Sequence, residues 1–391
     1  MEITIPANKE KIAVVVVGYN KYKGLQRLLN NLNDAYYGES DVPLVISIDA
    51  SGNTKVYELA RSFEWRHGVK YVNIEKERLG LKNHIFQCAS LSKLFKGAIV
   101  LEDDLFVSPY FYHYAKSTVE KYGHDEHVGG IALYSNEMNG FAQLPFIPVH
   151  NGFDVFAKQA VCSWGEIWTE SMWNGFTSWY ERWDKDFSKI DMYKRIKEWE
   201  RAWSKFYYAY LISTGRYFIY PYEPLSTNFN DAGGEHGGKN TINVHVSLLQ
   251  GKRVYQLGDF EQLVKYDVYS ENTELPDWLG MNKKDIDIDL YSTKESYNKR
   301  YVLTTAKLPF KIVKGFALAM RPWELNVKYG VEGEDICLYD RGDTEVVIPS
   351  RHIDIIKLIS YYLRGFNHGL IMRFDWIVLK QRIKEKLRIK K

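Results

Sequence analysis

Short apolar strands alternate with amphipathic helices over residues 11–104, and this alternation is the feature that most narrows the folds open to the chain. Residues 11–20 (KIAVVVVGYN) form a run of β-branched side chains, as expected of a strand that is covered on both faces. Residues 23–35 place leucines at helical spacing. Two more strand and helix pairs follow at 42–68 and 69–95, and a fourth strand at 96–104. The order predicts a doubly wound α/β sheet.

Polar side chains follow the predicted strands where each one ends. Asn20 follows the first strand, Asp49 the second, and Glu102, Asp103 and Asp104 the fourth. Ligands of such sheets bind beyond the carboxyl ends of the strands. Three adjacent carboxylates repel one another unless they are compensated, and Mg²⁺ or Mn²⁺ bridging to a diphosphate would compensate them. The alternative is a solvated acidic turn.

Other sequence features limit the kind of site to expect and indicate how the chain is organised. Neither GxGxxG after the first strand nor GxxxxGK[ST] is present, so the usual dinucleotide and P-loop phosphate cradles are missing. We expect one large domain at 1–257, with a change of pattern between a first half at about 10–150 and a second half at about 151–257. An appended α/β segment is expected at 258–372, and a Trp-rich helix at about 197–210.

The composition indicates which partners and compartments to expect. A net charge of +3 over 391 residues argues against a nucleic-acid partner. The three cysteines show no CxxC spacing, which favours a reducing compartment, and we expect neither a signal peptide nor a membrane span. Residues 373–391 combine basic side chains with an apolar stripe that includes Trp376, Leu379 and Ile383. This pattern predicts an amphipathic helix on an anionic membrane, and the alternative is a terminal helix packed on its own domain.

Several stretches together resemble a known family. LEDDLFVSPYF, VVVVGYN, ISIDASGN, RLGLKNH, CSWGEIW and PYEPLSTNFNDAGGEHGG follow in the order seen in GT-A fold nucleotide-sugar glycosyltransferases. The resemblance is to family 2-type bacterial enzymes and to the Golgi N-acetylglucosaminyltransferase I group, and it covers roughly residues 10–240. It implies that residues 1–257 are a Rossmann-like GT-A catalytic domain with a doubly wound mixed sheet. The nucleotide-sugar half would then be about 10–150 and the acceptor half about 151–257.

The resemblance also implies roles for individual residues. Asp104 would hold Mn²⁺ or Mg²⁺, Asp103 would contact the donor sugar or ribose, and Glu102 the donor sugar. Asp49 would hydrogen-bond the uracil or its ribose. Other positions would lie along the nucleotide-sugar: Gly18, Asn20, Gly80, Lys82, Asn83 and, at the diphosphate or metal, His236.

Each of these roles has a structural alternative. Asp49 could form an Asx-turn with Ser51 or Gly52, and Lys82 could be an ordinary surface charge. Asn83 could cap a helix beginning near His84, and His236 could simply be exposed in its glycine-rich loop.

An inverting transfer needs a general base for the acceptor hydroxyl. The resemblance places that base in a Trp-rich segment, usually as Asp, whereas this chain offers Glu198 and Glu200 beside Trp199 and Trp203. We favour Glu200 over Glu198, with Glu166 of CSWGEIW as a third candidate. The tryptophans could stack on sugar faces or pack in the core.

The expected function is therefore an inverting, metal-dependent transfer of a sugar from a UDP-sugar to a saccharide or lipid-linked saccharide in surface polysaccharide biosynthesis. The expected location is the cytoplasm, peripheral at the inner face of the plasma membrane. The alternatives are a nucleotidyltransferase with the same acidic metal site and an inactive carbohydrate-binding scaffold.

Overall fold

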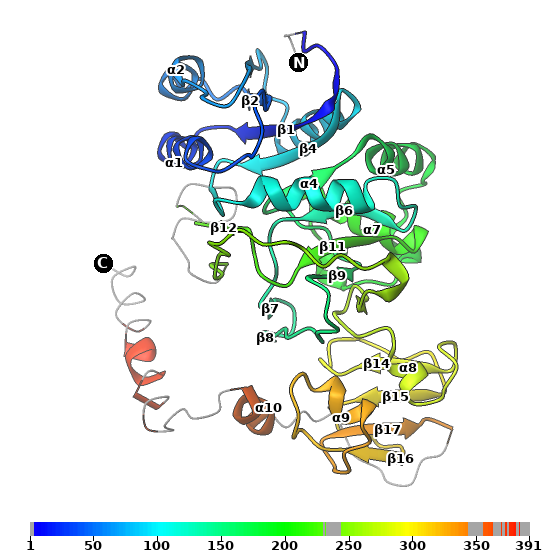
Figure 1. Ribbon diagram of the computed structural model, residues 1–391. Helices are drawn as coiled ribbons and strands as arrows, with labels where there is room; N and C mark the ends of the chain where they lie inside the picture. The colour runs from blue at the N-terminus through cyan, green and yellow to red at the C-terminus, as the bar shows by residue number, and fades with distance from the viewer. Residues whose placement is uncertain are drawn as a thin grey trace.

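The computed structural model describes residues 4–229, 231, 244–342, 355–362, 369, 372–373, 375–380 and 383. Its first part follows the predicted alternation of strands and helices (Figure 1). These elements are β1 (Asn8–Gly18), α1 (Tyr22–Asn33), β2 (Leu44–Ile48), α2 (Thr54–Ser62), β3 (Lys70–Ile74), α3 (Leu81–Ala89), the 3₁₀ helix η1 (Ser90–Lys93) and β4 (Phe95–Glu102). Burial of Ala13 to Val17 on both faces of β1 explains its uninterrupted apolar sequence.

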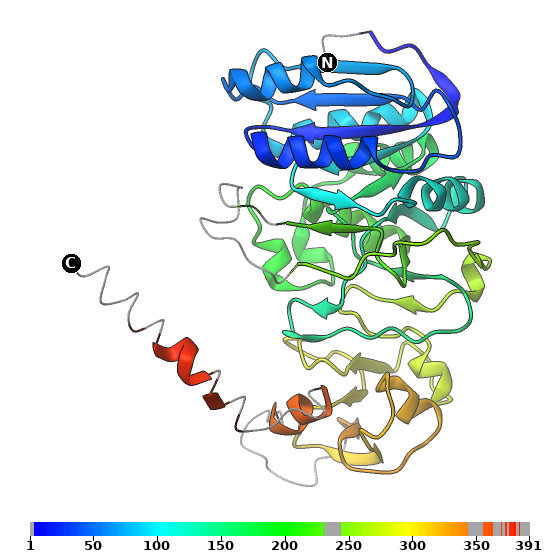
Figure 2. The ribbon, with the colours of Figure 1, turned by 60° about the vertical axis from the view of Figure 1, so that its left-hand side comes forward.

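The middle of the chain completes the region that was predicted as the catalytic domain. Its elements are β5 (Leu105–Val107), α4 (Phe111–Tyr122), β6 (Val128–Ala132), β7 (Met138–Asn139), β8 (Leu144–Pro145), β9 (Val155–Lys158), β10 (Glu166–Trp168), α5 (Glu170–Arg182), η2 (Phe187–Lys189), α6 (Lys194–Lys197), α7 (Ser204–Thr214), β11 (Tyr217–Pro221) and β12 (Ser226–Asn228). Helices lie on both faces of the central sheet (Figure 2). On one face, Phe86 of α3 packs against Trp173 of α5, with ring centroids 5.6 Å apart.

Nine strands of the described residues form one mixed sheet in the order β13-β9-β11-β6-β10-β4-β1-β2-β3. Strands β3, β2, β1 and β4 are parallel, and β10 inserts antiparallel between β4 and β6. Strand β6 therefore runs in the same direction as β4, and β11 is parallel to β6. The predicted α/β class and the doubly wound mixed sheet are confirmed. The carboxyl ends of β1, β2 and β4 share one edge, as the site requires.

The last part of the chain adds a second, smaller sheet. Its elements are η3 (Phe260–Gln262), β13 (Lys265–Tyr266), α8 (Leu275–Trp278), β14 (Ile286–Asp289), β15 (Tyr301–Thr304), β16 (Lys311–Phe316), α9 (Glu324–Lys328), β17 (Ile336–Asp340) and α10 (Ile355–Tyr362). Strands β14, β15, β17 and β16 form this sheet, whereas β13 joins the large one. The two sheets share a hydrophobic core that includes Tyr266, Ile288 and Tyr291.

Residues near the C-terminus that the structure describes are helical. Among residues 372–383, Trp376, Ile377 and Leu379 have side chains that are about half exposed. No helix in the described part of the chain combines the length and the apolar character that crossing a bilayer requires.

Candidate active site

The three acids lie at a tight turn between β4 and β5. Glu102 is the last residue of β4, and β5 begins at Leu105. Strand β12 pairs antiparallel with β5, and the Phe229 amide donates to the Asp104 carbonyl at 2.9 Å. The turn is thus held from both sides by backbone hydrogen bonds, so its carboxylates are fixed at the sheet edge.

An internal cation compensates part of this charge. The Lys21 ammonium, just before α1, lies 2.9 Å from Asp104 Oδ2 and 3.8 Å from Asp103 Oδ1. Burial lowers the pKa of Lys21, but the charges of Asp104 and Asp103 outweigh it and leave that pKa above the ordinary value. Lys21 therefore stays charged at neutral pH and offsets part of the charge of Asp103 and Asp104.

Asp103 is the most enclosed of the three acids. Its side chain is buried, and Oδ2 accepts a hydrogen bond from the Tyr19 amide at 3.2 Å. Burial raises its pKa to about 6, against the opposing pull of Lys21. Helix α1 lies directly on this turn, because a Cβ added to Gly24 would sit 2.4 Å from the Asp103 carbonyl oxygen. Any larger residue at position 24 would push the helix off the acidic turn.

Residues at the end of β12 and just after it extend the site. Asn228 Nδ2 donates to Asp104 Oδ1 at 3.1 Å, and Asp231 accepts from Arg27 of α1 at 2.5 Å. The Arg27 guanidinium also lies over the Phe229 ring, 3.7 Å from its centroid. Arg27 is thus paired with Asp231, so it adds no net charge to the acidic turn.

Asp49 organises the loop that precedes α3. Its carboxylate accepts hydrogen bonds from the amides of Ala50 at 2.9 Å, Leu79 at 2.8 Å and Gly80 at 2.9 Å. The Ser51 and Gly52 amides donate instead to the Tyr57 hydroxyl. The alternative Asx-turn therefore does not form. Instead, the Asp49 carboxylate joins the segment after β2 to the loop that precedes α3.

The other predicted nucleotide contacts lie around the same edge. Gly18 ends β1, and its Cα faces Asp103, because a Cβ there would lie 3.9 Å from Asp103 Oδ2. Asn20 accepts from Asn53 Nδ2 at 2.7 Å. Gly80, at φ +75°, is the N-cap of α3 and has open space where a Cβ would be.

Lys82 and Asn83 lie in the first turn of α3. The Lys82 ammonium is 5.3 Å from the centroid of Phe206, and Asn83 Nδ2 donates to the Leu79 carbonyl at 3.1 Å. The helix begins at Leu81 rather than near His84, so Asn83 is not its N-cap. His84 is buried instead, and its Nε2 lies 2.8 Å from Ser47 Oγ.

Glu166, the third candidate base, is buried inside the sheet. It lies across from Val100 of β4, and its Oε1 has no hydrogen-bond partner in the described part of the chain. Oε2 accepts only from the Gly165 amide at 3.1 Å. Burial, and next the charge of Glu102, raise the pKa of Glu166 well above its ordinary value. The protonated form of Glu166 is therefore favoured in this state relative to an exposed carboxyl group.

Glu198 and Glu200 are exposed, and the expected helix over 197–210 is wrong in its first half. Helix α6 ends at Lys197 and α7 begins at Ser204. The chain bends between them because its two tryptophans pack in different places. Trp203 is buried, 5.8 Å from Trp168, whereas Trp199 joins a separate cluster beside Phe141. The two rings therefore do not share a helix face, and Trp203 belongs to the core.

The acidic turn suits a divalent cation by charge and by ligand type. Carboxylate oxygens are the ligands that Mg²⁺ and Mn²⁺ prefer, and such ions often use one or two of them plus substrate phosphates. Asp104 is partly exposed, and the Lys21 ammonium lies 2.9 Å from its Oδ2. Among the described residues no group of three His, Cys, Asp or Glu side chains is arranged to hold a metal alone. The phosphates of a substrate would have to complete the coordination.

Sequence reasoning missed several members of this site. Lys21, Arg27, Asn228 and Asp231 were not among the predicted site residues, although the last two lie in the motif STNFND. The position of Lys21 one residue after Asn20, at the end of the first strand, is the signal that could have identified it. His236 lies outside the described residues.

Comparisons with known proteins give matches at the level of structure only. No protein-family model and no curated protein matches the sequence. S. aureus TarS 1-349 in complex with UDP-GlcNAc matches with 14% identity and a TM-score of 0.36, covering 58% of this chain and 60% of that one. GalNAc-T7 with UDP, GalNAc and Mn²⁺ matches with 14% identity and a TM-score of 0.37, covering 54% and 42%.

A third match is the mannosyltransferase PcManGT from Pyrobaculum calidifontis in complex with GDP-Man and Mn²⁺, with 14% identity and a TM-score of 0.29. It covers 42% of this chain and 45% of that one. Each of these alignments spans less than two thirds of the matched chain. The function proposed below therefore rests on the side chains of the site rather than on these matches.

Proposed function

We propose that this protein is a GT-A type glycosyltransferase that moves a sugar from a UDP-sugar to a saccharide or lipid-linked saccharide acceptor with the help of Mn²⁺ or Mg²⁺. The observation that carries the proposal is the fixed acidic turn of Glu102, Asp103 and Asp104 at the carboxyl edge of the parallel strands, where Asp104 is partly exposed beside the Lys21 ammonium. The order of motifs shared with the N-acetylglucosaminyltransferase I group supports the same function.

The proposed roles follow from the positions of the side chains. Asp104 is partly exposed and would hold the metal, whose charge stabilises the departing diphosphate. Asp103 and Glu102 would contact the donor sugar or ribose. Asp49 fixes the amides of Leu79 and Gly80, so it would shape the uridine pocket as well as contact the base or ribose.

The proposed stereochemical course is inversion, with a glutamate as base. Exposed Glu200 is the first choice and Glu198 the second, because an accessible carboxylate can be reached by the acceptor hydroxyl whose proton it would take. Burial raises the pKa of Glu166 and favours its protonated form, which makes it less suited to act as the base. The acceptor role in surface polysaccharide assembly is part of this proposal.

The metal role is tested by binding rather than by turnover alone. Asp104→Asn should abolish the increase in UDP affinity that Mn²⁺ confers, because a neutral amide cannot replace a carboxylate at a hard cation. Isothermal titration of UDP with Mn²⁺ and with EDTA measures this, and Asp277→Asn, at an exposed ion pair with Lys283 in the appended segment, is the matched control. If wild type binds UDP equally in both conditions, or Asp104→Asn behaves like the control, the metal site is refuted.

A further inference from the structure

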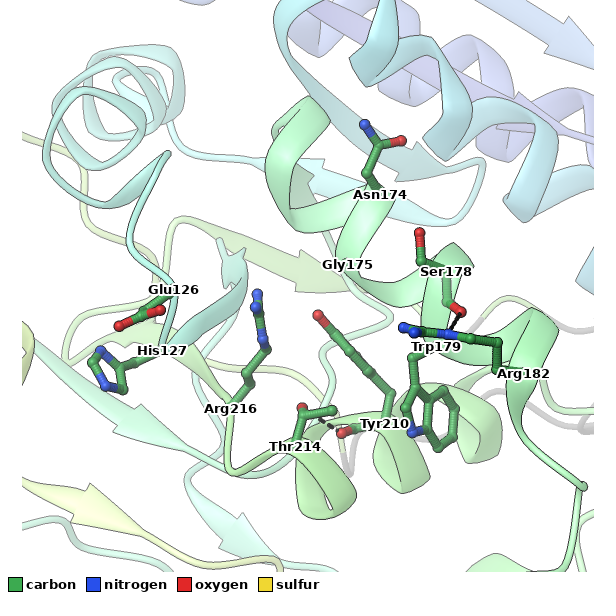
Figure 3. A pocket seen from close by; sticks show the side chains of 10 residues that line it. All are labelled: Glu126, His127, Asn174, Gly175, Ser178, Trp179, Arg182, Tyr210, Thr214 and Arg216. Carbon is green, nitrogen blue, oxygen red and sulfur yellow. Dashed lines mark hydrogen bonds between the residues drawn. The ribbon is translucent and has the colours of Figure 1, made fainter.

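A second pocket lies at the opposite edge of the sheet from the acidic turn. It has a volume of about 600 Å³, within the range of small-molecule sites. Its walls come from α5, α7 and the segments just before β6 and β11 (Figure 3). Since β6 and β11 run in the direction of β4, their starts lie at the far edge from Glu102. The pocket and the acidic turn are therefore separated by roughly the length of β4, which has eight residues at roughly 3.3 Å each.

The charge of this pocket is opposite to that of the acidic turn. Arg182 of α5 and Arg216 before β11 both line it, and no described carboxylate forms an ion pair with either guanidinium. Arg182 Nε donates to the Ser178 carbonyl at 2.9 Å, which fixes the base of the guanidinium and leaves its terminal nitrogens for other partners. Arginine offers planar, paired donors that match the oxygens of phosphate and carboxylate groups.

A buried hydroxyl here has a donor beside it but no acceptor for its own proton. The Tyr210 side chain is 1% exposed, the Arg216 guanidinium lies beside its hydroxyl, and no acceptor for the hydroxyl proton lies within hydrogen-bond geometry in the described part of the chain. Figure 3 shows this hydroxyl directed toward the space between the two arginines. Buried hydroxyls nearly always donate a hydrogen bond, so this one suggests that an acceptor on a ligand completes it.

The floor of the pocket depends on a glycine inside a helix. A Cβ at Gly175 of α5 would lie 2.6 Å from the Tyr210 hydroxyl and 3.3 Å from Arg216 Nη1. Glycine in a helix interior is less favourable than alanine. Here it keeps open the space into which Tyr210 and Arg216 project.

The remaining lining sets the size and the limits of the ligand. Trp179 supplies an apolar wall, and Asn174 adds an amide. Glu126 is the one carboxylate among the lining residues, and the neighbouring His127 is already paired with Asp125 at 3.2 Å. The cationic end of the pocket is therefore the end formed by Arg182, Arg216 and Tyr210, with room beside it for a neutral ring.

We propose that this pocket is a second ligand site that binds an oxyanion group, phosphate or carboxylate, carried on a small polar ring such as a sugar. The two guanidinium groups would hold the anion, the Tyr210 hydroxyl would donate to it, and Trp179 would lie along the ring. The site is separate from the acidic turn and does not depend on the activity proposed for that turn.

Titration calorimetry in EDTA, without nucleotide, tests the site with glucose 1-phosphate, inorganic phosphate, glucuronate and uncharged glucose. We expect glucose 1-phosphate to bind and glucose not to. Arg182→Gln and Arg216→Gln should each weaken binding by roughly tenfold or more, because a hydrogen bond to a charged group is lost. Gly175→Ala should also weaken it while leaving both charges in place. Arg61→Gln, at an exposed arginine in the last turn of α2, should not.

The outcomes distinguish a phosphate ligand from a carboxylate ligand, and binding in this pocket from binding at the acidic turn. Binding of glucose 1-phosphate and glucuronate alike supports a general oxyanion site, and binding of only one of them identifies the group. If neither anion binds better than glucose, or if the arginine and glycine variants bind like Arg61→Gln, the proposal is overturned. Asp104→Asn should leave this binding unchanged, and Arg216→Gln should leave UDP binding with Mn²⁺ unchanged, so either site can fail alone.

Discussion

Replacing Asp103 by asparagine should make the folded protein more stable at neutral pH. In the folded state burial raises the pKa of Asp103 from 3.8 to about 6, so ionising it above that pH costs stability. At about 1.4 kcal/mol for each pKa unit, the cost is about 3 kcal/mol. An asparagine has nearly the same shape, can still accept from the Tyr19 amide, and carries no charge to be desolvated. Asp103→Asn should therefore raise the free energy of unfolding by up to about 3 kcal/mol at pH 7.5.

The sign of the pH dependence makes this prediction specific. Between pH 3.8 and about 6 the folded chain holds a proton on Asp103 that the unfolded chain has lost, so stability falls as the pH rises through this window. The advantage of Asp103→Asn should therefore be complete above about pH 6 and shrink toward zero as the pH falls toward 4.

Urea unfolding in EDTA at several pH values between 4.5 and 8 measures the difference. Asp34→Asn, at an exposed carboxylate after α1, is the matched control and should change little. A loss of stability at pH 7.5, or a gain that does not depend on pH, would refute the reasoning. The same substitution should reduce transfer, because asparagine lacks the carboxylate that is proposed to contact the donor. Residues selected for a site often stabilise the fold less than neutral replacements do.

Three further predictions concern the same site and the C-terminus. Lys21→Met should tighten Mn²⁺ binding in the presence of UDP, measured by titration, because the ammonium no longer competes for Asp104 Oδ2. Lys23→Met, at an exposed neighbour in α1, is the control. Weaker Mn²⁺ binding by Lys21→Met would contradict the competition. Glu200→Gln should lower transfer by about 10² to 10⁴ with UDP affinity unchanged. If Glu198→Gln or Glu166→Gln shows that loss instead, the base is reassigned to that residue. Truncation after Gly369 should release the protein from anionic vesicles at low salt, because each basic residue near the surface adds about 1 kcal/mol of attraction; equal sedimentation of both forms would show that the tail does not bind membranes.

The parts of the fold that could be predicted were those with a strong local pattern. The run of valines in β1 and the acids after β4 mark a buried strand and a strand end without reference to the rest of the chain. The role of Lys21 could not be found in this way, because it depends on residues 83 positions away. The burial of Glu166 depends on β10, a three-residue strand too short to be recognised by periodicity.

The second pocket shows the same limitation more clearly. Gly175 and Arg182 come from α5, Tyr210 from α7 and Arg216 from the segment before β11, and none forms part of a sequence motif. The irregular segment between α6 and α7 likewise reflects where Trp199 and Trp203 find space to pack, which helix propensity does not encode.

The pairing of β5 with β12 has a consequence for the order in which the protein is made. Asn228 reaches Asp104 across 124 residues of sequence, whereas Lys21 reaches it from a part of the chain already synthesised. At the usual translation rates of 5–20 residues per second, Asn228 of β12 is synthesised roughly 6 to 25 s after Asp104. During that interval Lys21 can already neutralise part of the turn, so the first strands can assemble on the ribosome before the far side of the site exists.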